Sequence, residues 1–171
     1  KPGAVNESGT LFEGIQRWSE TKSDFTVDEI KQRAKIGIKK EMLHGVQLIR
    51  SHADVTDPNL TSLKALLELK EELKDTVTLQ IVSFPQEGMY AYPHGAELVE
   101  EGLRLGADCV GGIPHYELAR EFGEKSLHRA VELAVKYDRR IDVHCDETDD
   151  DQSRHLELLT ALVTMEGIGA R

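Results

Sequence analysis

The stretch "KYDRRIDVHCDE", from Lys136 to Glu147, joins the end of a helical pattern to a short apolar run with a polar end. Three earlier runs share its character, being short, rich in Val and Ile and bounded by polar or turn residues: "VQLIRSHADV" (46–55), "VTLQIVSF" (77–84) and "DCVGGIP" (108–114). Runs of this kind are typical of buried strands. With "RIDVH" (140–144), the sequence predicts four strands.

Helical patterns separate the four strands and also precede the first. Their apolar residues recur at spacings of three and four, as on one face of an amphipathic helix. The expected helices cover 9–22, 26–45, 60–74, 95–106, 126–137 and 151–167. Thr26 is expected to cap the second helix, with Asp28 and Glu29 favourably placed in its first turn. Alternating strands and helices imply parallel strands joined by right-handed crossovers.

The strand-plus-helix repeat has a period of about 30 residues, like one unit of a (β/α)₈ barrel, a fold of about 250 residues. The 171 residues hold four such units. Periodicity alone leaves two folds open, a four-stranded open α/β sheet or half of a barrel. Neither G-x-G-x-x-G nor a Walker A pattern is present, which disfavours a nucleotide-binding sheet.

Charge and composition restrict the class of partner. The chain has 21 Lys and Arg against 31 Asp and Glu, a net charge of −10, which argues against nucleic acids and anionic membranes. No apolar run approaches the roughly 18 residues of a membrane span, and the first ten residues lack the pattern of a signal peptide. Cys109 and Cys145 lack C-x-x-C spacing and are expected to be reduced thiols. These features predict a cytoplasmic protein.

Polar residues gather at the predicted strand ends, where parallel α/β folds place their chemistry. The four ends read "RSHAD", "SFPQE", "GIPHY" and "VHCDE", and they contribute His52, Gln86 with Glu87, His115 and His144. A cap or loop contact explains His52 or His115, taken singly, equally well. No strand ends in Lys and no G-x-S-x-G is present, which disfavours a Schiff-base aldolase and a serine hydrolase.

The end "VHCDE" indicates chemistry most strongly. His144 is an imidazole at a strand end, a common ligand of Zn²⁺ or Fe²⁺. Glu147 follows three residues later, placed to reach a water at the metal without ligating the metal itself. Asp146 is expected to raise the proton affinity of this Glu by like-charge repulsion, whereas the acidic run 149–151 is expected to cap the next helix. The residues favour a metal-assisted hydrolase.

Five blocks of the sequence together resemble the bacterial cytosine deaminases of the amidohydrolase superfamily: "SGTLFEGIQRW" (8–18), "FPQEG" (84–88), "RLGADCVGGIPH" (104–115), "KYDRRIDVHCDE" (136–147) and "DDQSR" (150–154). The similarity runs over essentially the whole chain. It implies a distorted (β/α)₈ barrel that binds one catalytic divalent metal, iron or zinc. The fold class is then α/β, a parallel βα repeat forming strands 2 to 5 of an amidohydrolase-type TIM barrel. Residues 1–45 would be leading helices, and 46–171 the four βα units of one partial domain.

The resemblance also implies roles for residues at the strand ends. His144 would be the metal ligand of strand 5, and Glu147 would be the proton shuttle. Gln86 would hydrogen-bond to the amide edge of a pyrimidine, and Phe84 would help to wall the ring. Further candidates for contacts around the ligand or the pocket are His52, His115 and Asp146.

The sequence departs from the family pattern at the remaining ligands. The H-x-H of strand 1, the His of strand 6 and the Asp of strand 8 have no counterpart in the 171 residues. We therefore expect the middle of an enzyme that, at full length, hydrolyses cytosine to uracil and ammonia. The 171 residues alone are expected to be inactive, to bind no metal tightly and to form a homo-oligomer. The alternatives are a related amidohydrolase acting on an isocytosine-like or triazine ring, and a non-catalytic half-barrel that self-associates.

Overall fold

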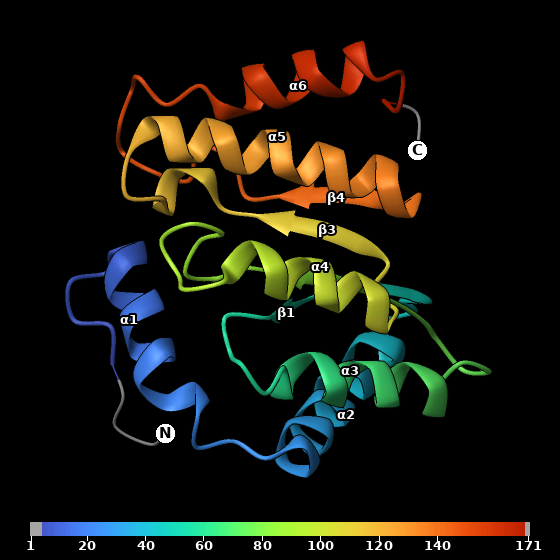
Figure 1. Ribbon diagram of the computed structural model, residues 1–171. Helices are drawn as coiled ribbons and strands as arrows, with labels where there is room; N and C mark the ends of the chain where they lie inside the picture. Colours follow the sequence, from blue (N-terminus) through green and yellow to red (C-terminus); the bar gives the residue numbers. More distant parts are fainter. Residues whose placement is uncertain (1–4, 170–171) are drawn as a thin grey trace.

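The computed structural model describes residues 5–169 and contains one sheet of four parallel strands in the order β1-β2-β3-β4 (Figure 1). The strands are β1 (Leu48–Asp54), β2 (Thr78–Phe84), β3 (Cys109–Gly112) and β4 (Arg140–Val143). Each lies inside the range predicted for it. Spatial order equals chain order, so every crossover connects neighbouring strands, as in successive units of a barrel.

All six predicted helices are present. They are α1 (Leu11–Lys22), α2 (Val27–Leu43), α3 (Thr61–Glu72), α4 (Gly95–Leu105), α5 (Arg120–Tyr137) and α6 (His155–Met165). Thr26 caps α2 as expected, and Glu29 completes a capping box with it. The sequence pattern did not predict the short 3₁₀ helix η1 (Pro114–Tyr116), and α5 begins earlier than its apolar stripe indicated.

The crossover helices cover one face of the sheet and form the main core with it. In Figure 1, helices α6, α5, α4 and α3 follow one another from top to bottom, while α1 stands at the left, on the side to which the arrows of β3 and β4 point. Fully buried residues of this core include Leu63, Leu69, Ile81, Val99, Val110 and Leu133. This packing leaves the carboxyl ends of the strands facing α1.

The other face of the sheet is concave. Arg50 on β1 donates from Nη1 to Asp142 Oδ2 on β4 at 2.7 Å, although these two strands are not hydrogen-bonded to each other. Side chains of the outermost strands meet only if the sheet curls toward its own axis, as a barrel wall does. Of the two folds that the sequence left open, this curvature confirms part of a barrel and rules out a flat open sheet.

Two further sequence predictions concern the chain as a whole. Cys109 is buried and Cys145 half-buried, and both are free thiols. Within residues 5–169, no helix combines the length and the apolar composition that crossing a membrane requires.

Candidate active site

Three aromatic rings from three strands meet at the carboxyl end of the sheet. The His144 ring lies 4.5 Å from the Phe84 ring and 4.7 Å from the His52 ring, measured between centroids. His52 and Phe84 are in edge contact at 5.1 Å. Two of the three histidines at predicted strand ends are therefore brought together, above a phenylalanine that is only 1% exposed.

Asp142 organises this group from β4. Its Oδ1 lies 2.8 Å from His52 Nε2, and its Oδ2 accepts from Arg50. Burial alone would raise the pKa of Asp142, but the hydrogen bonds from Arg50 and His52 outweigh it and hold the pKa below its usual value. Asp142 is thus a carboxylate whose two oxygens are both engaged.

His144 differs from His52 because no hydrogen bond reaches its ring within residues 5–169. Burial, followed by the neighbouring His52, lowers the pKa of His144, which favours the neutral imidazole. Its Nδ1 lies 4.0 Å from Glu147 Oε2, the carboxylate that the sequence singled out. The Glu147 side chain is 57% exposed.

The donor set fits a zinc or iron ion. One ligand atom each from His52, Asp142 and His144 all lie within 4.8 Å of one another. Two imidazoles and a carboxylate are the donor types that these ions bind. Since Asp142 already holds Arg50 and His52, His144 is the free donor of the three.

Gln86 connects two cavities at the strand ends. One, of about 350 Å³, is also lined by His52 and Phe84. The other, of about 500 Å³, is also lined by Glu147 and by the first turns of α1. Trp18 lines both. The substrate and proton-transfer residues predicted from the sequence therefore border adjoining cavities beneath α1.

Helix α1 is fixed over these cavities by two side chains that the sequence reasoning missed. Trp18 Nε1 donates to Asp54 Oδ2 at 2.7 Å. Lys22 Nζ contacts the same oxygen at 3.3 Å, donates to Thr56 Oγ1 at 2.9 Å and pairs with Glu87. The available signal was the spacing of Trp18 and Lys22, four apart on one face of a predicted helix.

His115 lies in η1, outside the cluster of His52 and His144. Both of its ring nitrogens are buried without a hydrogen-bond partner among the described residues. Burial lowers its pKa, so the neutral form is favoured. His115 is thus a neighbour of the site, close enough for the charge of Glu147 to act on its pKa, and shares no hydrogen bond with His52 or His144 among the described residues.

Asp146 has a different role from the one expected. Its carboxylate accepts from the backbone N–H groups of His155 at 2.9 Å and Leu156 at 3.0 Å, and from the hydroxyl of Ser153. Burial raises its pKa, but these hydrogen bonds outweigh burial and lower the pKa to about 2. The prediction that 149–151 cap α6 was wrong, because the chain folds back and brings Asp146 to the amides at the start of that helix.

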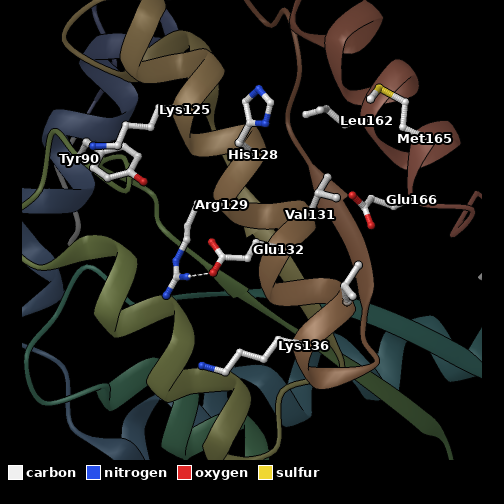
Figure 2. Close-up of a pocket in the computed structure, with 11 residues that line it drawn as sticks. Tyr90, Lys125, His128, Arg129, Val131, Glu132, Lys136, Leu162, Met165 and Glu166 are labelled. Carbon is white, nitrogen blue, oxygen red and sulfur yellow. Dashed lines mark ion pairs between the residues drawn. The ribbon is translucent and has the colours of Figure 1, made fainter.

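A larger cavity, of about 650 Å³, lies away from the strand ends between α5 and α6. Figure 2 shows Arg129 paired with Glu132 along its wall, at 2.8 Å, and Lys125 beside Tyr90. The Lys125 ammonium lies 4.4 Å from the centre of that ring. Of its charged lining residues, Arg129 and Glu132 pair with each other, and the cavity contains no cluster of metal donors among the described residues.

Comparisons with known proteins show what this chain is similar to. No family model matches the sequence. The crystal structure of 5-methylcytosine deaminase from Klebsiella pneumoniae, liganded with 5-fluorocytosine, superposes with a TM-score of 0.96 at 50% identity, over 99% of this chain and 41% of that one. N-isopropylammelide isopropyl amidohydrolase of Pseudomonas sp. (strain ADP) is 37% identical over 70% of this chain. Pterin deaminase of Rhizobium rhizogenes is 26% identical over 87% of it.

The chain spans 30% of the length of the Pseudomonas relative, 34% of the Rhizobium one and 41% of the Klebsiella structure. Its four parallel strands superpose on the wall of a larger barrel. By sequence and by fold, the chain belongs to the amidohydrolase superfamily and groups there with the cytosine deaminases.

Proposed function

We propose that this chain carries part of the active site of a metal-dependent hydrolase that converts cytosine and water to uracil and ammonia. The observation that carries the proposal is the pair of His144, whose ring has no hydrogen-bond partner within residues 5–169, and Glu147, a carboxylate 4.0 Å away. Glu147 lines the cavity beside the first turns of α1, in a chain that is 50% identical to a deaminase solved with a fluorinated cytosine.

His144 is the proposed metal ligand, with His52 and Asp142 beside it. The bound metal, zinc or iron, would supply Lewis acidity and activate water. Asp142 holds His52 in place through Oδ1, and Arg50 balances the carboxylate charge. Phe84 closes the base of the cluster and keeps bulk water from its lower side.

Glu147 is the proposed proton carrier. A carboxylate that is exposed and close to the ligand ring can accept a proton from the attacking water and deliver it to the ring nitrogen of the pyrimidine. The water oxygen becomes the carbonyl oxygen at C4, and the amino group leaves as ammonia. Atoms and charge balance without any further reactant.

Gln86 is the proposed reader of the substrate ring. Its side-chain amide makes no hydrogen bond within residues 5–169 and borders both cavities. A carboxamide offers one donor and one acceptor group, which match the N–H and C=O of an amide edge. Phe84, on the wall of the smaller cavity, would contact the ring face.

A second substrate class is another nitrogen heterocycle, isocytosine-like or triazine. The relatives favour keeping it open, because they are named for N-isopropylammelide and for pterin as well as for 5-methylcytosine. The alternative that is not an enzyme is a non-catalytic half-barrel that self-associates.

The test is ammonia release by the full-length protein loaded with zinc or iron. Cytosine, 5-methylcytosine, isocytosine and a triazine should be assayed side by side. Highest kcat/KM on a cytosine supports the proposal. If only another ring is deaminated, that ring replaces cytosine as the proposed substrate. If metal-loaded protein turns over none of the rings, the non-catalytic alternative is favoured.

A further inference from the structure

The segment that carries Gln86, residues 85–91, connects β2 to the turn before α4. Since the Gln86 amide has no hydrogen-bond partner within residues 5–169, no hydrogen bond of its own fixes its direction. The backbone of its own segment then sets where the side chain starts and which cavities it can reach. Whatever holds that backbone therefore decides whether Gln86 faces a ligand.

Glu117 holds this backbone. Its carboxylate accepts from three consecutive N–H groups, those of Met89 at 2.6 Å, Tyr90 at 3.1 Å and Ala91 at 2.8 Å. Glu117 follows η1, which comes after β3. It lies 28 residues beyond Met89 in the chain, about the length of one βα unit. Hydrogen bonds from amides to a carboxylate are stronger than those between neutral groups. One side chain thus ties the end of β2 to the end of β3.

Gly88 makes the close approach possible. It has a φ of +88°, and a Cβ at this position would lie 2.9 Å from Glu117 Oε2. Any other residue would both strain the backbone and push the carboxylate away. The glycine of "FPQEG" is therefore part of the same device.

Helix α1 also holds this segment. Lys22 pairs with Glu87, the residue after Gln86, and also donates to Thr56 beyond β1. Two charged contacts therefore hold the residues that follow Gln86, one from Lys22 to Glu87 and one from Glu117 to the amides of 89–91.

We propose that Glu117 is a positioning residue for substrate binding, acting through the backbone of 85–91 to aim Gln86. The inference rests on the proposed function. It predicts that weakening the Glu117 contacts damages ring binding far more than turnover, because an interaction equal in ground and transition states changes KM and leaves kcat.

The variant to make in the full-length protein is Glu117→Gln, which keeps the shape but presents an NH₂ group to the backbone amides. Glu121→Gln, an exposed change on the first turn of α5, is the matched control. Hydrogen exchange should show amides of 89–91 exchanging about tenfold faster in Glu117→Gln only. For cytosine, KM should rise about tenfold with kcat within about threefold of wild type.

A double-mutant cycle with Gln86→Ala separates positioning from general support. If Glu117 acts through Gln86, the KM effect of Glu117→Gln should shrink to about twofold or less in the Gln86→Ala background. Full additivity, or an unchanged KM in an active enzyme, would overturn the inference and leave the proposed function standing. A metal-loaded wild-type protein that deaminates no ring would overturn both.

Discussion

Two regions of the molecule concentrate charged and polar side chains, and at one of them some of these groups have no hydrogen-bond partner among the described residues. On the outer face of α4 and α5, Glu100 is 8% exposed and accepts from Arg129, Lys136 and Tyr137 at 2.6 to 2.7 Å. At the strand ends, the Gln86 amide and the His144 ring have no hydrogen-bond partner within residues 5–169, and the Glu147 carboxylate reaches His144 only at 4.0 Å.

The difference indicates which region is built for a ligand. A buried polar group normally finds its partner inside the protein, as Glu100 does. Groups left free beside a cavity keep their hydrogen-bonding capacity for something that arrives later. In the larger cavity of Figure 2, Arg129 and Glu132 likewise find their partner inside the protein, because they pair with each other.

The largest effect is expected when the 171-residue chain is studied on its own. We expect it to self-associate, to bind no metal tightly and to have no deaminase activity. A catalytic zinc site takes about three protein ligands, and of the three donors here Asp142 is engaged by Arg50. Within the described residues, β1 and β4 each pair on one side only, and open edges promote association. Light scattering after size-exclusion chromatography, with metal analysis, decides this. A monomer holding one equivalent of metal would contradict it.

The next largest effect is expected from Glu147→Gln in the full-length protein. Losing one general acid–base group should lower kcat by about 10²–10⁴-fold, while metal content stays unchanged because His144 is untouched. The matched control is Glu157→Gln, on the first turn of α6, whose side chain is 74% exposed. Activity near wild type in metal-loaded Glu147→Gln would remove Glu147 from the mechanism.

Gln86→Ala should have a smaller effect. A carboxamide that loses its ligand contact should cost about 1–3 kcal/mol in kcat/KM, a factor of about 5 to 150, through KM. Metal content should not change. Gln16→Ala, on the exposed face of α1, should leave the kinetics as they are. An unchanged kcat/KM for cytosine would show that Gln86 does not bind the substrate and that "FPQEG" is only a structural turn.

These positions also show how far the sequence alone leads. The strands and helices were predictable because each apolar run follows one period, and His144 and Glu147 could be singled out as candidates because they follow the end of a predicted strand. The contact of His52 with Asp142 was not, because it joins residues 90 apart across a curved sheet. The early start of α5 depends on Gly123, where a Cβ would lie 2.5 Å from the carbonyl oxygen of Pro114. Such tertiary contacts leave no mark in a local pattern.

The smallest effect is expected at Glu100, whose carboxylate has its partners inside the protein. The pKa of Glu100 is lowered to about 2, first by its hydrogen bonds to Lys136 and Tyr137. The folded state therefore favours the ionised carboxylate, so its stabilisation is fully present above the ordinary pKa of 4.5 and is lost as the pH falls toward 2. Replacing Glu100 by Gln should lower the free energy of unfolding by about 1–3 kcal/mol at neutral pH.

The same substitution should matter less in acid, because wild type itself becomes protonated there. The matched control is Glu101→Gln on the same helix, whose side chain is 44% exposed and has one ion pair, with Arg104. An exposed pair of this kind contributes at most about 1 kcal/mol. Urea unfolding of the three proteins at neutral pH and at about pH 3 measures the difference. Two outcomes would contradict this prediction: a loss of unfolding free energy in Glu100→Gln no larger than in Glu101→Gln, or a loss as large in acid as at neutral pH. Either would mean that the hydrogen bonds of Glu100 to Arg129, Lys136 and Tyr137 do not stabilise the fold as proposed.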